Sequence, residues 1–234
     1  MTDLEHRIET LAELLHSAKN LVVFTGAGIS TESGLPDFRG PDGLWTRKEK
    51  GLPIPDTSGW SGAEPNDGHQ AIVEIQNLNK LKFLISQNVD NLHLKSGIHP
   101  ELLAELHGNL TKIRCSKCEF TMDNFGERVG CPQCGAKMKP SVVDFGQSLP
   151  KTDLEDAIKH SQEADLFLVV GSSLVVYPAA DMPRLAVESG AKLVIINQGN
   201  TPMDGIASLR FYEKIGLVLL PAVERLRELL KAGM

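Results

Sequence analysis

Four cysteines form the most specific pattern in the 234-residue sequence. Cys115 and Cys118 make one Cys-x2-Cys pair, and Cys131 and Cys134 make a second pair after an interval of twelve residues. Two such pairs supply four thiolates, the ligand set of a closed tetrahedral zinc site. Disulfides or a redox pair are the competing interpretation. Because four cysteine ligands leave no open coordination position, the predicted Zn²⁺ is structural rather than catalytic.

A glycine-rich turn directly follows a continuous apolar run over residues 21–24. Gly26, Ala27 and Gly28 match the first half of a dinucleotide-binding turn, whose glycines let the backbone approach a pyrophosphate. The third glycine of that motif would fall at Thr31, and the acidic residue expected about 20 residues later is absent. The turn therefore predicts a nucleotide site and disfavours an ordinary dehydrogenase. A tight strand-to-helix turn without a ligand is the alternative.

The polar and titratable side chains that a cleft at the strand ends would need follow a second apolar run. Gln87, Asn88, Asp90 and His93 come at its end, and His107 follows further along the chain. Histidine has the side-chain pKa that suits general-base catalysis near neutral pH. A single histidine at a helix end is otherwise a cap or a surface residue. The assignment of His107 as a base therefore depends on its neighbours.

A loop after the glycine turn combines a rigid proline, an aromatic ring and a cation, at Pro36, Phe38 and Arg39. Such a loop could fold over a bound nucleotide as a lid. An ordinary surface loop anchored by one buried phenylalanine is the alternative, and the sequence alone does not separate the two. The Gly- and Pro-rich stretch 40–68 that follows is expected to be a long loop or a minimal helical insertion.

Apolar strands alternate with amphipathic segments, which positions these motifs. We expect strands at 21–24, 81–85, 165–170 and 193–196. We expect helices from residue 2 and at 67–78, 101–106, 152–164, 181–189 and 216–232, with capping-box patterns at 2–5 and 152–155. This alternation predicts an α/β fold with a doubly wound, mostly parallel sheet, which binds ligands at its strand ends.

Composition excludes several classes of function. The 24 Lys and Arg residues against 30 Asp and Glu residues give a net charge of −6. This charge argues against direct nucleic-acid binding, because phosphate contacts need a basic face. No apolar run approaches the roughly 18–20 residues of a membrane span. The first residues lack the features of a signal or transit peptide, so we expect a cytoplasmic protein without membrane contact.

The order of the motifs is similar to that of the sirtuins, a family of NAD-dependent protein-lysine deacylases. The resembling motifs are Gly26-Ala27-Gly28-Ile29-Ser30, Gly34 to Gly40, Gln87-Asn88-Val89-Asp90 with His93, His107-Gly108, the paired Cys-x2-Cys and Gly171-Ser172-Ser173-Leu174. The resemblance runs from about residue 20 to about residue 220. The stretch FRGPxGxWT at 38–46 and the short span before His69 resemble the class IV branch most.

The resemblance implies a single catalytic domain over 1–234, with NAD and an acyl-lysine protein or peptide entering between two parts. A Rossmann-like large domain would span 1–40, 80–110 and 140–234, and a small inserted zinc-binding module would span 41–79 and 111–139. The implied NAD-binding residues are Gly26, Ala27, Gly28, Ser30, Asp37, Phe38, Arg39, Gln87, Asn88, Asp90, Gly171, Ser172, Ser173, Asn197 and Ile215. The implied catalytic residues are His107 as general base, Asn88 and Asp90, the substrate contacts are Val143, Phe145 and Gly146, and the zinc ligands are the four cysteines.

The implied reaction transfers the acyl group of a lysine to ADP-ribose and releases nicotinamide. Mono-ADP-ribosylation at the same NAD site and a non-catalytic zinc-module protein that binds NAD or a partner are the alternatives. Asp144 and Gln147 depart from the aromatic and Glu residues of the family's substrate segment, which leaves the flanking-sequence preference open. The Tyr-x2-Arg pair of sirtuins that prefer succinyl groups is missing from its segment, which favours acetyl or longer neutral acyl groups.

Overall fold

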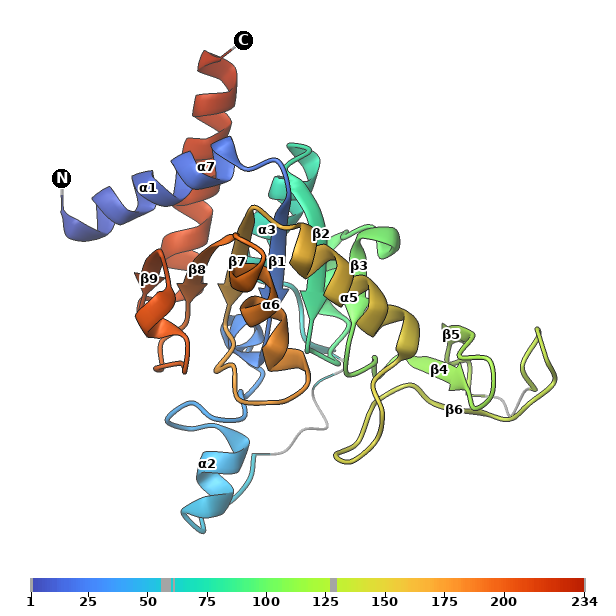
Figure 1. Cartoon of the computed structure of the whole chain (residues 1–234). Helices are drawn as coiled ribbons and strands as arrows, with labels where there is room; N and C mark the ends of the chain where they lie inside the picture. The colour runs from blue at the N-terminus through green and yellow to red at the C-terminus, as the bar shows by residue number, and fades with distance from the viewer. Residues whose placement is uncertain (1, 56–59, 61, 127–129, 234) are drawn as a thin grey trace.

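The computed structural model describes residues 2–55, 60, 62–126 and 130–233. Its centre is a parallel sheet of six strands in the order β3-β2-β1-β7-β8-β9, with helices on both faces (Figure 1). From β1 the chain adds strands first on one side and then on the other. The α/β fold with a doubly wound parallel sheet is therefore confirmed, and its switch point lies between β1 and β7.

Four of the six strands contain the apolar runs that the sequence predicts, and the two edge strands are additional. Their bounds are β1 (Leu21–Thr25), β2 (Leu81–Ser86), β3 (Leu103–Glu105), β7 (Leu166–Val170), β8 (Lys192–Ile196) and β9 (Leu209–Phe211). Every residue of β1 and β7 is buried, because helices cover both faces of the sheet. Strand β9 was not predicted, since three residues at a sheet edge are too short to show a periodicity.

Two groups of helices enclose the sheet. On one face α1 (Asp3–Ser17), α3 (Asp67–Asn77) and α7 (Ile215–Ala232) share a core with the strands. On the other face α5 (Lys151–Glu163) and α6 (Met182–Glu188) build a second core. The first predicted capping box is confirmed: Thr2 Oγ1 accepts the backbone N–H of Glu5, and the Glu5 carboxylate accepts that of Thr2.

Helix α3 does not match the expected division of the chain. Its Ala71, Ile72 and Ile75 are fully buried in the core that α1, α7 and the large sheet share. The resemblance implied that residues 41–79 belong to the small module. The packing instead places this helix with the large sheet, because its apolar face is buried there.

Two local predictions were wrong. Residues 101–106 form a 3₁₀ turn (Pro100–Leu102) followed by β3 rather than a helix. Leu103 pairs with Leu84 of β2, so the sheet edge satisfies backbone groups that a helix of one and a half turns would leave open. The capping box at 152–155 does not form, since α5 already begins at Lys151 and Pro150 offers no side-chain cap.

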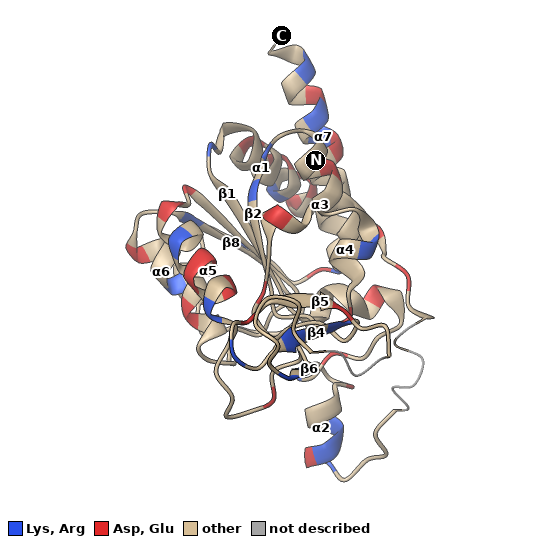
Figure 2. Cartoon of the chain, turned by 90° about the vertical axis from the view of Figure 1, so that its right-hand side faces the viewer, with Lys and Arg blue, Asp and Glu red and all other residues tan. Residues whose placement is uncertain are grey.

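A small antiparallel sheet carries the cysteines at the end of the molecule away from the C-terminus (Figures 1 and 2). Its strands are β4 (Lys112–Cys115), β5 (Thr121–Asp123) and β6 (Met138–Pro140), in the order β5-β4-β6. The short helices α2 (Leu44–Glu49) and α4 (Leu92–Ser96) complete the fold, and α2 is the minimal helical insertion expected within 40–68. Within the described residues, no helix is both long and apolar enough to cross a membrane.

Candidate active site

A cavity of about 500 Å³ lies where β1, β2, β7 and β8 end. Its lining contains every residue predicted to bind NAD, to catalyse or to contact the substrate: Gly26, Ala27, Gly28, Ser30, Asp37, Phe38, Arg39, Gln87, Asn88, Asp90, His107, Val143, Phe145, Gly146, Gly171, Ser172, Ser173, Asn197 and Ile215. The carboxyl ends of parallel strands and the loops after them gather these side chains from distant parts of the sequence. The individual roles of these residues stay predictions.

The glycines after β1 and β7 allow the backbones of the two loops to pass each other in direct contact. The backbone N–H of Gly28 donates to the carbonyl oxygen of Gly171 at 2.8 Å. A Cβ atom on Gly28 would lie 2.7 Å from the Cα atom of Gly171, and Gly171 itself has φ +67°. Sequence reasoning attributed the first glycines to the approach of a pyrophosphate. The crossing of the two loops requires them independently of any ligand.

A hydrogen-bonded group joins the loop after β1 to the loop after β2. Ser30 Oγ donates to Asp90 Oδ2 at 2.6 Å and accepts the Asn88 side-chain N–H at 3.1 Å. The Asn88 Oδ1 atom is buried and has no hydrogen-bond partner among the residues that the structure describes. A buried acceptor without a partner is costly unless a ligand supplies the donor. Carboxamide and ribose hydroxyl groups are such donors, so this position fits NAD.

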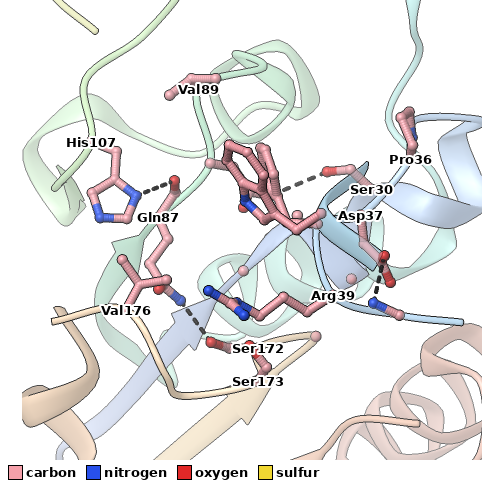
Figure 3. A pocket seen from close by; sticks show the side chains of 18 of the residues that line it. Ser30, Pro36, Asp37, Arg39, Gln87, Val89, His107, Ser172, Ser173 and Val176 are labelled. Atoms are coloured by element: carbon pink, nitrogen blue, oxygen red, sulfur yellow. Dashed lines mark hydrogen bonds between the residues drawn. The ribbon is translucent and has the colours of Figure 1, made fainter. Parts of the chain in front are cut away.

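His107 is oriented by the loop after β2. Its Nδ1 lies 2.9 Å from the carbonyl oxygen of Gln87, and Gln87 Nε2 donates to Ser172 Oγ at 2.8 Å (Figure 3). A carbonyl only accepts, so Nδ1 carries the proton and Nε2 keeps its lone pair, with no hydrogen-bond partner among the described residues. Burial lowers the pKa of His107. The imidazole is therefore neutral at pH 7 and able to accept a proton.

The predicted lid loop reaches the predicted substrate segment through a stacked and an edge-to-face pair of aromatic rings. The ring centroids of Phe38 and Trp45 are 6.2 Å apart, and those of Trp45 and Phe145 are 5.9 Å apart. Phe38 is 37% exposed, so the alternative of a surface loop anchored by a buried phenylalanine is wrong. The Asp37 carboxylate accepts the backbone N–H of Gly40 at 2.8 Å and fixes the turn of the loop.

The predicted substrate segment is hydrogen-bonded to the backbone of His107. The backbone N–H of Val143 donates to the carbonyl oxygen of His107 at 2.9 Å. A Cβ atom on Gly108, which has φ +76°, would collide with the carbonyl group of Ser141, so the pair His107-Gly108 depends on glycine at its second position. Asp144 is exposed beside the same segment and accepts a hydrogen bond from Gln147.

His93 lies behind the cavity rather than in it. Its Nε2 is 2.8 Å from Thr25 Oγ1, and its ring centroid is 5.1 Å from that of His69. Both rings are buried, and burial lowers the pKa of His93 well below its ordinary value and that of His69 to about 4. The expectation that His93 is a cleft side chain was wrong, because the turn after Asp90 directs it into the core.

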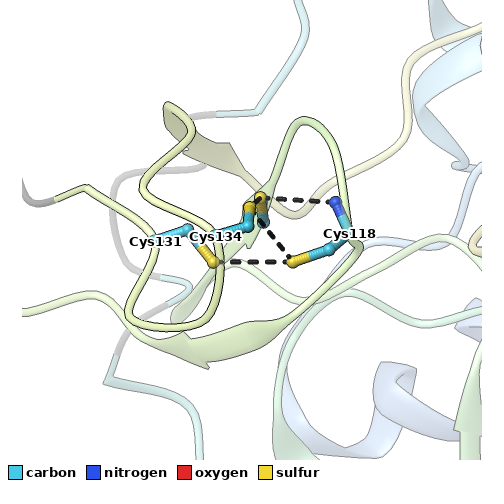
Figure 4. A group of neighbouring side chains, drawn as sticks. Cys118, Cys131 and Cys134 are labelled. Atoms are coloured by element: carbon cyan, nitrogen blue, oxygen red, sulfur yellow. Dashed lines mark hydrogen bonds between the residues drawn. The ribbon is translucent and has the colours of Figure 1, made fainter.

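The four cysteine sulfurs lie within 4.8 Å of one another. Three of the Sγ–Sγ distances are 3.5 Å (Figure 4), too long for a disulfide bond of about 2.05 Å. They are close to the roughly 3.8 Å edge of a tetrahedron with Zn–S bonds of about 2.3 Å. The backbone N–H groups of Cys118 and Lys117 point at the Cys115 sulfur and lower the pKa of that thiol to about 6. The cluster fits one structural zinc.

The sequence analysis missed several residues that line the cavity. Trp45, Trp60, Val176 and Tyr177 all do so. Tyr177 follows the motif Gly171-Ser172-Ser173 by only a few positions, and that proximity was the available signal. The cations Arg47 and Lys48 of helix α2, which follows the lid loop, do not line the cavity. Arg47 Nε donates to the carbonyl oxygen of Pro53, and Lys48 Nζ lies over the Trp45 ring.

The sequence matches the Sir2 family over residues 26–61 and 56–178. The NAD-dependent protein deacylase 2 of Archaeoglobus fulgidus is 41% identical over 252 residues, which cover 97% of this chain and 98% of the relative. The chain belongs to the Sir2 family. The NAD-dependent protein deacetylase SRT1 of Arabidopsis thaliana is 42% identical over 235 residues, 95% of this chain, and the Sir2-family chain spans about half (50%) of that plant relative.

Solved structures of Sir2 proteins share the fold of this Sir2-family chain. A Sir2 homologue in complex with NAD has a TM-score of 0.76 at 35% identity, with 95% of this chain and 94% of the other covered. Sir2 bound to an acetylated peptide has a TM-score of 0.71 at 33% identity, with 97% and 98% covered. The predicted family and its Rossmann-like fold are confirmed.

Proposed function

We propose that this Sir2-family chain is an NAD-dependent protein-lysine deacylase that removes acetyl or longer neutral acyl groups. One observation carries the proposal: a neutral histidine with a free Nε2 lies in the same cavity as the buried, unpartnered Asn88 oxygen. Relatives that cover nearly the whole chain are named NAD-dependent protein deacylases, which supports the same activity.

Different residues of the cavity would contact different parts of NAD. Ser30 and the segment 171–173 would hold phosphate and ribose oxygens, and Asn197 would bind the adenosine end. Gln87, Asn88 and Asp90 would line the nicotinamide end, where Asn88 Oδ1 accepts a donor. When bound, NAD supplies a ribose carbon that receives the acyl oxygen as nicotinamide leaves, so that the acyl group ends on ADP-ribose.

His107 would act as the general base of this reaction. Its Nε2 accepts a proton from a hydroxyl group, while the Gln87 carbonyl oxygen holds Nδ1–H and stabilises the imidazolium that forms. Phe38 and Trp45 line the cavity on the side of the lid loop and would restrict the entry of water when NAD is bound. A dry cavity favours transfer to the acyl group over simple hydrolysis.

The segment at Val143, Phe145 and Gly146 would bind the acyl-lysine substrate. Extended peptides pair with exposed backbone without strong demands on sequence, and a structural neighbour is bound to an acetylated peptide. The zinc site would stabilise the small sheet, whose strand β6 leads directly into this segment. Zinc takes no part in the chemical step in this proposal.

We also propose a branch of the family, a location in the cell and a division into domains for this chain. The stretch 38–46 supports membership of the class IV branch, and free cysteines arranged for a metal support a reducing, cytoplasmic location. The net charge of −6 argues against direct nucleic-acid binding. We retain a division into a large domain and a zinc-binding module, with α3 transferred to the large domain because of its packing.

Mass spectrometry of an acetyl-lysine peptide incubated with the protein and NAD tests the proposal. We expect the free lysine peptide, nicotinamide and O-acetyl-ADP-ribose in equal amounts. A peptide that gains ADP-ribose and keeps its acetyl group would indicate a mono-ADP-ribosyltransferase instead. An unchanged peptide, in a protein that binds NAD, would favour the non-catalytic alternative.

A further inference from the structure

The loop after β8 forms one wall of the cavity and is held from behind by one arginine. Asn197, Gly199 and Asn200 line the cavity. Arg210, in the edge strand β9, does not line it, and its side chain is only 11% exposed. The mechanism proposed above does not use Arg210.

The Arg210 guanidinium group contacts both the loop and its own strand. Nη2 donates to the Gly199 carbonyl oxygen at 2.6 Å, and Nη1 donates to those of Asn197, at 2.7 Å, and Phe211. Its Nε donates to Asp204 Oδ1 at 2.8 Å, and the group lies 3.8 Å from the centre of the Tyr212 ring. The planar guanidinium group of arginine can donate hydrogen bonds to several acceptors of this kind at the same time.

The far end of the loop depends on the same ion pair. The Asp204 carboxylate that Arg210 contacts also accepts the backbone N–H of Thr201 at 3.0 Å and its hydroxyl at 2.7 Å. The Asn197 side chain donates to the Gly199 carbonyl oxygen at 2.8 Å. Residues 197–201 are therefore tied at both ends to one guanidinium group. Without it, the loop loses its charge-assisted hydrogen bonds.

We propose that Arg210 is a positioning residue that fixes the loop 197–201 in the shape that binds the adenosine end of NAD. This inference rests on the proposed function, since it assumes that NAD occupies the cavity. Arg210 reaches the Asp204, Asn197 and Gly199 acceptors from three different nitrogens, whereas lysine carries its three donors on one nitrogen and lacks this planar fork. Lysine at position 210 would therefore only partly replace arginine.

A matched control lies on the other side of β9. Arg7 donates to the Arg210 carbonyl oxygen at 3.1 Å and to Glu213 at 2.7 Å, and it lies 5.0 Å from the centre of the Phe211 ring. Like Arg210, Arg7 forms an ion pair and also lies over an aromatic ring. It neither lines the cavity nor contacts the loop 197–201. Arg7→Gln therefore removes comparable interactions without a direct effect on the loop.

The test is calorimetric titration of full-length wild type, Arg210→Gln, Arg210→Lys and Arg7→Gln with NAD, ADP-ribose and an acetyl-lysine peptide. We expect Arg210→Gln to raise the Kd for NAD and for ADP-ribose about tenfold, which corresponds to about 1.4 kcal/mol. Arg210→Lys should raise it less, and Arg7→Gln should leave it within about twofold. The Kd for the peptide should not change in any variant that keeps its thermal transition, and Arg210→Lys serves if Arg210→Gln does not fold.

Two outcomes would overturn the inference. One is an unchanged Kd for ADP-ribose in both Arg210 variants, and the other is an equal rise in Arg7→Gln. A wild-type protein that binds neither NAD nor ADP-ribose would contradict the proposed function as well. The two failures are therefore distinguishable.

Discussion

The cavity and the cysteine cluster differ in the distances along the chain that they span. The four predicted zinc ligands lie from Cys115 to Cys134, and two tight turns bring their sulfurs together. The cavity takes residues from Gly26 to Ile215, and only the complete parallel sheet brings them together. A local site depends on its own spacing, whereas a site at strand ends depends on the whole topology. The two regions should therefore respond differently to metal removal, substitution and acid.

Removal of zinc should have the largest effect and should begin in the small module. Chelation, or Cys118→Ser, should unfold the sheet β5-β4-β6 and abolish deacylation, because the substrate segment follows β6 directly. The large sheet, which contains no cysteine, should keep its own thermal transition. Metal analysis with calorimetry measures both. Ser116→Ala, in the same turn, is the control, and a fully active zinc-free protein would contradict the prediction.

Acyl selectivity should show that the cavity lacks the Tyr-x2-Arg pair that would hold a charged acyl end. Among the described residues, only Arg39 and Lys214 line it as cations, and Tyr177 lines it without the Tyr-x2-Arg spacing. An unpaired carboxylate entering an apolar channel costs several kcal/mol. We expect kcat/KM for a succinyl-lysine peptide to lie at least about 100-fold below that for the near-isosteric, neutral pentanoyl peptide. Succinyl as the better substrate would refute this.

Acid should weaken the large domain through the histidines behind the cavity. The folded pKa of His69, at about 4, is below the ordinary value of 6.5, because burial disfavours the charged ring. The unfolded chain therefore binds more protons between these values, so the free energy of unfolding falls as pH drops from 6.5 to 4. One such group contributes roughly 3 kcal/mol over that window.

Denaturant titrations at several pH values measure this slope. His69→Gln should reduce it, whereas His99→Gln, at a side chain that is 61% exposed, should leave it unchanged. Equal slopes in wild type and His69→Gln would show that His69 is not the titrating group. The result would also show whether the acid-sensitive part of the molecule is the large domain rather than the cysteine cluster.

The same comparison explains what the sequence could predict. Apolar strands and the Cys-x2-Cys pairs are local patterns, so the order of elements along most of the chain and the clustering of the four cysteines were predictable without coordinates. The edge strands β3 and β9 were not, because three residues take their structure from pairing with a neighbour. Similarly, nothing local distinguishes the buried His93 from His107 in the cavity. Their difference comes from the turn after Asp90 and the contact with Gln87.

In the proposed function, His107 performs a proton transfer in a cavity that binds NAD independently of this histidine. The most direct measurement combines the Kd for NAD with the rate of deacylation in His107→Ala. We predict a Kd within about twofold of wild type and a rate reduced at least about 100-fold, the usual loss for a general base. A variant that binds NAD normally and deacylates at nearly the wild-type rate would contradict the account.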